Sequence, residues 1–224
     1  ESSAASDVYK RQVPQDDRPV SLQYTVDTAR EAGMTILTPP QNLISGKNYQ
    51  GQADQIMAWV EQNAGRADVM VLSTDTLIYG GLVDSRKHNI PLTTLESRLK
   101  RIESLKARNK NVRIYGFGTV MRSPRASGGG TEPAYYAEYG PTIFQIAALQ
   151  DKLDSGSLTQ EETQKLMSLQ ASVPVEYLQD WFDRRQKNMK INKELIDETR
   201  SGVFDYFALG HDDTSQSVSY THLR

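Results

Sequence analysis

The sequence predicts an α/β fold in which helices alternate with the strands of a parallel sheet. Short runs of apolar residues recur along the chain without polar alternation, as is typical of strands buried on both faces. Stretches with helical periodicity separate these runs, and that alternation favours parallel pairing. A partial (β/α) barrel and an open Rossmann-like sheet both fit this order.

Four apolar runs are predicted strands: Thr35–Thr38, Val69–Leu72, Val112–Val120 and Val203–Leu209. Pro39 stops the first run, because proline cannot donate to a sheet ladder. We expect a further strand before Asp16, of which Val13-Pro14 would be the end. Strand ends matter here because ligands of parallel sheets bind at the carboxyl edge.

Helical patterns are predicted between the strands. The first group comprises Val20–Ala32, Ala53–Ala64 and Leu92–Asn109, the last with a T-x-x-E capping box at Thr93 and Glu96. An all-helical insertion at about residues 123–202 precedes the last strand. Its helices are expected near Pro141–Leu153, Gln160–Leu169 and Pro174–Ser201, with a second capping box at Thr159 and Glu162.

Composition excludes several classes of protein. The chain has 224 residues, of which 38% are hydrophobic and 24% charged, values typical of a globular protein. A net charge of -2 argues against a nucleic-acid surface over the whole chain. The absence of Cys excludes disulfides, thiolate nucleophiles and Cys-based metal sites. No apolar stretch approaches the roughly 20 residues of a membrane span.

Both ends of the sequence resemble translated sequencing adapters. Ser2–Gln12 and Val218–Arg224 back-translate into adapter sequence that ends in a transposase recognition end. We therefore expect tails at residues 1–12 and 218–224 that are not natural, around an incomplete α/β domain at 13–217. On this interpretation a C-terminal half is missing, and the compartment, cytoplasmic or exported, stays open.

Charged residues gather where the predicted strands end. Asp16, Asp17 and Arg18 follow the expected first strand. Asp75, with Tyr79 and Arg86 further on, follows the second buried run, Arg122 the next, and Asp212 and Asp213 the last. Converging carboxylates and arginines suit acid–base chemistry, a divalent cation or sugar hydroxyls. A single Asp can also cap a helix, as Asp16 or Asp17 would after Pro19.

The last long helix carries polar residues on its apolar stripe. Arg185 and Asn192 share that face with apolar side chains, and Asn188 is their neighbour. The stripe either faces a polar site, or Arg185 reaches solvent or a structural carbonyl. Tyr135, Tyr136 and Tyr139 could stack on a ligand, but such residues more often pack a helix start.

These strand-end strings resemble the bacterial domain of unknown function 4127 family. They are Asp16–Val20, Ser73–Val83 with Ser85-Arg86, Met121-Arg122, the R-x-x-N-x-x-x-N helix of Arg185, Asn188 and Asn192, and Asp212-Asp213. The resemblance covers Val13–Thr214 and departs from the family at His211, where Gln is usual. It implies a longer protein with further acidic motifs, and it carries over no activity.

Two functions fit these residues. The first is a carboxylate-based hydrolase, glycosidase-like, acting on a glycan or similar polar substrate; the second is a non-catalytic module that binds a ligand or a divalent cation. In the first, Asp75, Asp212 and Asp213 are the candidate catalytic residues. The candidate substrate-binding residues are Asp17, Arg18, Tyr79, Arg86, Arg122, Arg185, Asn188 and Asn192. No cofactor is required by the sequence, although a divalent cation is possible. Nucleic acid is not an expected partner, and no membrane span is expected.

Overall fold

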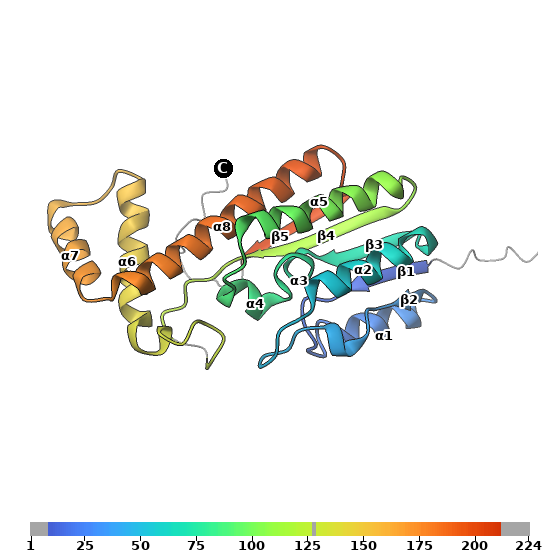
Figure 1. Cartoon of the computed structure of the whole chain (residues 1–224), viewed down its shortest axis with the longest axis horizontal. Coiled ribbons are helices and arrows are strands. Elements are labelled where there is room, and N and C mark those ends of the chain that lie inside the picture. Colours follow the sequence, from blue (N-terminus) through green and yellow to red (C-terminus); the bar gives the residue numbers. More distant parts are fainter. Residues whose placement is uncertain (1–8, 127–128, 212–224) are drawn as a thin grey trace, which may run out of the picture. The chain divides into compact units, whose positions relative to one another are not determined.

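The computed structural model describes residues 9–126 and 129–211 (Figure 1). Chain contacts divide it into two compact units. The sheet unit contains residues 9–85, 90–118 and 194–209, and the helical unit contains residues 86–89 and 119–193, with 210–211. Asp212 and Asp213 lie outside the described residues.

The five strands form one open, parallel sheet (Figure 1). The strands are β1 (Tyr9–Val13), β2 (Thr35–Leu37), β3 (Val69–Ser73), β4 (Arg113–Val120) and β5 (Tyr206–His211). Their order is β2-β1-β3-β4-β5, so β2 and β5 are edges of the sheet. The barrel alternative is therefore wrong, and the open Rossmann-like alternative is confirmed, with the strand order of flavodoxin-like sheets.

The predicted strands appear with small changes in their bounds. β5 begins three residues later than the apolar run that starts at Val203, because Phe204 turns inward as a buried loop residue. The expected first strand is Tyr9–Val13, and four of its five residues belong to the segment that we attribute to adapter sequence. That attribution stays a prediction.

Helices connect the strands and carry most of the apolar core. They are α1 (Gln23–Glu31), α2 (Ala53–Asn63), α3 (Thr74–Tyr79), α4 (Leu82–Lys87), α5 (Leu92–Arg108), α6 (Tyr136–Asp154), α7 (Gln160–Ala171) and α8 (Val175–Arg200), with short 3-10 turns at Gln41–Leu43 and Ala64–Arg66. The sequence missed α3 and α4, which are too short to show a period. Among the described residues, no helix combines the length and the apolar character that crossing a membrane requires.

Helix starts test the two predicted capping boxes. The box at α7 is confirmed, since the Thr159 hydroxyl accepts from the Glu162 N–H and the Glu162 carboxylate accepts from the Thr159 N–H. The box at α5 is wrong: Pro91 is the N-cap and no side chain caps the helix. Because the helix begins at Leu92, directly after Pro91, Thr93 already lies in the first turn and cannot be the N-cap.

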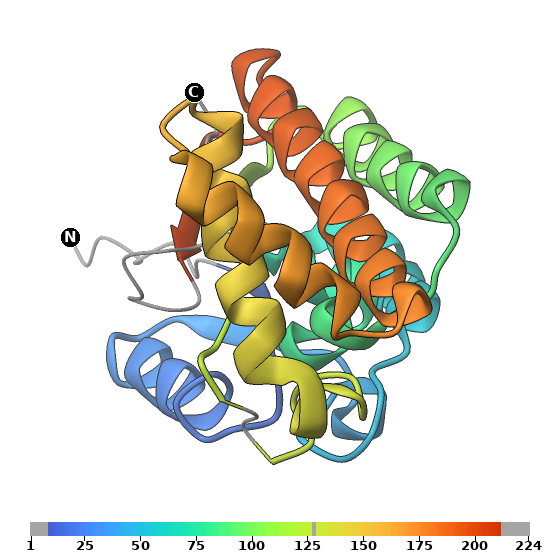
Figure 2. The same cartoon turned by 90° about the vertical axis from the view of Figure 1, so that its left-hand side faces the viewer.

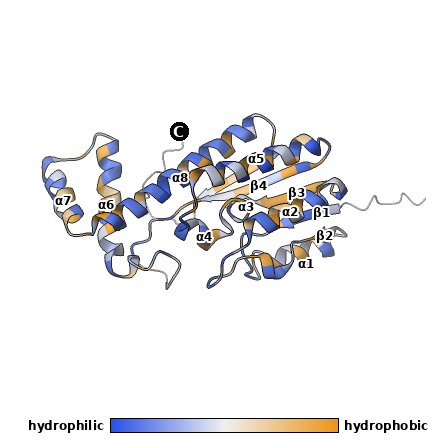
Figure 3. Cartoon of the chain, viewed as in Figure 1, coloured by the Kyte–Doolittle hydropathy of each residue, from blue (hydrophilic) through white to orange (hydrophobic). Residues whose placement is uncertain are grey.

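The sheet unit packs helices on both faces of the sheet. A right-handed connection from β1 to β2 runs opposite to the connection from β2 to β3, so α1 and α2 cover different faces. Figure 2 shows α1 (blue) and α5 (green) on different sides. The buried residues of α5 form one stripe, Leu95, Leu99, Ile102 and Leu105. Along β3 the hydrophobic colour is nearly continuous (Figure 3), as a strand buried on both faces requires.

The helical unit has a core of its own. Tyr136 stacks on Trp181 with ring centroids 4.3 Å apart, and Tyr135 stacks on Tyr177 at 4.6 Å. The Tyr136 hydroxyl donates to the carbonyl of Pro124 over 2.6 Å. These tyrosines therefore pack the helices together, which is the structural alternative considered for them above.

Candidate functional site

The sheet reverses its strand order between β1 and β3. The chain leaves β1 toward β2 on one side and leaves β3 toward β4 on the other, so the two connections diverge. In open parallel sheets such a switch point forms a crevice at the carboxyl ends of the strands, where ligands bind. Val13 of β1 pairs with Leu72 of β3, which places the residues after both strands at this edge.

Asp75 is the central carboxylate of this switch point. It lies in the first turn of α3, directly after β3, and is 2% exposed. The side-chain amide of Gln15, which follows β1, donates to Asp75 Oδ2 over 3.0 Å. The Thr76 hydroxyl donates to the carbonyl of Pro14 over 2.7 Å. Two adjacent strand ends are thus joined by side chains, and Asp75 is held at their junction.

The loop after β1 holds its own two carboxylates. Arg18 donates to Asp16 Oδ2 from Nε over 2.9 Å and forms an ion pair with it from Nη2 over 2.7 Å. The Tyr49 hydroxyl donates to Asp17 Oδ2, and this hydrogen bond raises the pKa of Tyr49. Capping by Asp16 or Asp17 is wrong, because Leu22 is the N-cap of α1 and no side chain bonds there.

Tyr79 ends α3 as a buried phenol. Its burial raises the pKa of Tyr79 well above the ordinary value, and the negative charges of Asp75 and then Glu194 raise it further. The phenol therefore stays protonated at physiological pH and keeps its hydrogen-bond donor. The predicted role of Tyr79 toward a substrate stays a prediction.

The two glycines after Tyr79 are required by close packing. Gly80 has a φ of 108°, a left-handed conformation that ends α3. A Cβ on Gly51 would lie 1.9 Å from the Gly80 carbonyl oxygen, and one on Gly81 would lie 1.8 Å from Ser45 Oγ. The Y-G-G segment of the motif is therefore explained by how the 45–51 loop packs on it.

A cavity of about 370 Å³ adjoins the switch point in the sheet unit. Gln15, the partner of Asp75, lies in its wall. The other lining residues are Lys10, Arg11, Gln12, Val20, Ser21, Thr25, Ala29, Ile36, Val71 and Phe117. Its volume is in the range of small-molecule sites. Three of the lining residues, Lys10 to Gln12, belong to the predicted adapter segment.

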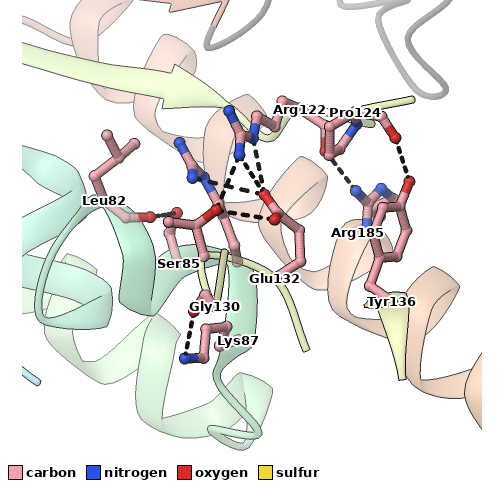
Figure 4. A network of polar contacts seen from close by, with 11 residues as sticks. Leu82, Ser85, Lys87, Arg122, Pro124, Gly130, Glu132, Tyr136 and Arg185 are labelled. Carbon is pink, nitrogen blue, oxygen red and sulfur yellow. Dashed lines mark hydrogen bonds and ion pairs between the residues drawn. The ribbon is translucent and has the colours of Figure 1, made fainter. Parts of the chain in front are cut away.

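A second polar cluster lies within the helical unit (Figure 4). Glu132 is 3% exposed and accepts from Arg122 Nε over 2.9 Å and from Nη2 over 2.5 Å. Arg86 Nη1 is 3.8 Å from the same oxygen, Oε1. The Thr131 hydroxyl donates to Glu132 Oε2 over 2.9 Å. We call Arg86, Arg122, Thr131 and Glu132 the arginine cluster.

The polar residues of α8 are buried in the helical unit. Arg185 is 3% exposed; its guanidinium carbon lies 3.3 Å from the Trp181 ring centroid, and Nη2 donates to the Arg122 carbonyl over 2.5 Å. Asn188 Oδ1 bonds His88 Nε2 at 2.8 Å, and Asn192 Nδ2 donates to the Thr119 carbonyl over 3.4 Å. Arg185 therefore reaches a structural carbonyl and does not extend to solvent.

The predicted site residues thus fall into two groups. Asp17, Arg18, Asp75 and Tyr79 belong to the sheet unit, whereas Arg86, Arg122, Arg185, Asn188 and Asn192 belong to the helical unit. Sequence reasoning missed Gln15, Tyr49, Glu132 and the role of His88. The position of Gln15 between a strand and Asp16 could have indicated it; Glu132 carried no comparable signal.

No metal centre is defined by the described part of the chain. Within residues 9–126 and 129–211, no three or more His, Asp or Glu side chains are grouped so that they could hold an ion. Asp75 and Asp16 each have a protein partner at hydrogen-bond distance. Their oxygens are thus engaged with nitrogen donors.

The fold and its strand-end residues define a doubly wound α/β protein with a polar site at its switch point. The chain belongs to the family described as "Protein of unknown function (DUF4127)", whose model matches residues 12–223. The matched range contains every residue on which the resemblance rested. The searches of curated proteins and of solved structures gave no match.

Proposed function

We propose that the chain carries active-site residues of a carboxylate-based hydrolase that acts on a glycan or similar polar substrate, and that these residues lie at the carboxyl edge of the sheet. The observation that carries the proposal is Asp75, a buried carboxylate at a switch point with Gln15 bonded to one oxygen. The amide donor fixes the orientation of the carboxyl group, as acid–base catalysis requires of a group that exchanges a proton with the substrate.

The surroundings of Asp75 supply groups that hydrogen-bond hydroxyls. Tyr79 keeps its phenolic proton, whereas Asp17 and Arg18 are more exposed on the loop after β1, and Tyr49 reaches Asp17 from the 45–51 loop. Sugar hydroxyls both donate and accept, so a mixed set of carboxylate, guanidinium and phenol suits them. The adjoining cavity of about 370 Å³ provides room for a ring-sized group.

Glycoside hydrolysis needs a second carboxylate besides the acid. Asp212 and Asp213 are our candidates because they follow β5, which belongs to the same parallel sheet as β3. One of them would act as base or nucleophile while Asp75 protonates the leaving oxygen.

The test uses the protein expressed from its complete reading frame. Asp75→Asn, Asp212→Asn and Asp213→Asn are assayed singly against a panel of glycans, with Asp27→Asn on the exposed face of α1 as the matched control. We expect turnover to fall at least about a hundredfold in Asp75→Asn, the usual weight of general acid catalysis. Wild-type turnover in all three variants would refute the hydrolase.

A second candidate is a non-catalytic module that binds a polar ligand or a divalent cation. The engagement of Asp16 by Arg18 and of Asp17 by Tyr49 favours the ligand-binding version of this module, because carboxylates held in this way are fixed hydrogen-bond acceptors. Elemental analysis of the purified protein, with and without chelator, tests the cation version. Metal-free protein that is indifferent to the chelator would exclude a resident cation.

A further inference from the structure

We propose that the arginine cluster is a binding site for a small organic carboxylate, and that Glu132 occupies this site from within the chain. The proposal is independent of hydrolysis at Asp75, since it concerns contacts inside the helical unit. Arg86 and Arg122 would bind the carboxylate of the ligand, and Glu132 would compete with the ligand for them.

The contacts around Glu132 resemble those of a bound carboxylate ligand. Arg122 Nε and Nη2 both donate to Oε1 of Glu132 (Figure 4). Arg86 Nη1 is 3.8 Å from the same oxygen, and the Thr131 hydroxyl donates to Oε2. Guanidinium groups paired with hydroxyl donors are the usual recognition set for carboxylates. Both carboxylate oxygens of Glu132 therefore have the donors that the carboxylate of an external ligand would use.

The arginine cluster is accessible to solvent through the Arg122 side chain. The Arg122 side chain is 22% exposed, whereas the Glu132 side chain is 2% exposed. A ligand can thus reach the Arg122 guanidinium from solvent, and Glu132 must leave its buried position for the ligand to take its place. Arg185 holds the Arg122 backbone carbonyl, which keeps the base of the side chain in place.

The backbone before Glu132 can yield to a competitor. Gly129 and Gly130 have φ values of 67° and 87°, and a Cβ on Gly130 would meet no heavy atom within 4 Å. Lys87 donates to the Gly130 carbonyl over 3.0 Å, an exposed contact of modest strength. Exchange of Glu132 for an external carboxylate conserves the charge of the cluster, so both guanidinium groups keep an anionic partner.

The experiment titrates the complete protein with glucuronate by isothermal calorimetry at constant ionic strength. Glucose serves as the uncharged counterpart and inorganic phosphate as a different anion. We expect saturable binding of glucuronate that exceeds the binding of glucose and phosphate. Glu132→Gln removes the internal competitor and should tighten glucuronate binding about tenfold, whereas Arg122→Gln should abolish it.

Two further variants keep the test decisive. Glu132→Ala removes the competing carboxylate together with its stem and should tighten glucuronate binding to a similar extent, which covers the case that Glu132→Gln does not fold. Glu176→Gln removes an exposed carboxylate from the first turn of α8 and should leave binding unchanged. The proposal would be overturned if glucuronate did not bind, if glucose bound equally well, or if only phosphate bound. It would also be overturned if both Glu132 variants folded and bound glucuronate with unchanged affinity.

Discussion

Gln15 Nε2 donates a hydrogen bond to Asp75 Oδ2 over 3.0 Å and so joins the loop after β1 to the helix after β3. The two residues are 60 positions apart in the sequence. The bond links neighbouring strand ends at the switch point and orients the carboxylate on which the proposed function rests.

Gln15→Leu should destabilise the sheet unit by about 1–3 kcal/mol, because a buried acceptor loses its donor. Urea unfolding followed by circular dichroism measures the loss. Gln23→Leu, which changes an exposed residue of α1, is the control and should shift stability by less than about 0.5 kcal/mol. If the two variants were equally stable, the hydrogen bond between Gln15 and Asp75 would not contribute to the stability of the sheet unit.

Gly51→Ala should destabilise the protein more than an ordinary surface substitution. The new Cβ would lie 1.9 Å from the Gly80 carbonyl oxygen, so backbone must move on one side. We expect a cost of about 1–3 kcal/mol from this overpacking. Gly65→Ala is the matched control, because its nearest heavy atom would be Asn109 Oδ1 at 3.8 Å. Equal melting temperatures would show that the loop accommodates the methyl group.

Glu198→Gln should stabilise the protein at neutral pH. Partial burial and then the charge of Glu103 raise the pKa of Glu198 above its ordinary value of 4.5. A raised carboxyl pKa favours the folded state below the unfolded value, and this contribution disappears as pH rises through the folded value. The wild type should therefore lose stability as the pH rises above 4.5, and the variant should lose less.

Melting temperatures of wild type and Glu198→Gln, compared from pH 4 to pH 7, check this sign. Glu176→Gln has the same change of charge on an exposed part of α8 and is the control. An increase in wild-type stability across that range relative to both variants would contradict the assignment.

Thr159→Ala should cost about 1 kcal/mol in the helical unit, the usual weight of an N-cap. The hydroxyl accepts from the Glu162 N–H over 3.2 Å, and the substitution leaves that donor without its cap. Thr163→Ala is the control within α7, because its hydroxyl bonds a helix carbonyl that already accepts a backbone N–H. Urea unfolding of the two variants measures the difference.

The strands were predictable because parallel strands buried on both faces leave long apolar runs, as Val69–Leu72 does. The short helix α3 was not, since six residues are less than two turns and the helix depends on the Ser73 cap and Gly80. The failed box at Thr93 has a related cause: Pro91 fixed the helix start earlier than the local pattern indicated.

The position of a polar side chain at the carboxyl edge of the sheet was predictable where it follows a strand directly, as with Asp75, whose role stays a prediction. Gln15 had the same signal, but its bond to Asp75 joins residues 60 positions apart, and Glu132 had no signal because Arg86 lies on a distant segment. A sequence pattern places residues along one element, whereas these contacts depend on which strands are neighbours. For the bond between Gln15 and Asp75, the order of the strands was the missing information.

Stacking of Trp181 on Tyr136 gives the protein a built-in optical probe. The chain has two tryptophans, and Trp181 is buried in the helical unit while Trp59 lies half-buried on α2 of the sheet unit. The guanidinium of Arg185 over the Trp181 indole will shift its emission relative to that of Trp59. Single Trp→Phe variants therefore give each unit a separate fluorescence signal, by which the order of their unfolding can be followed.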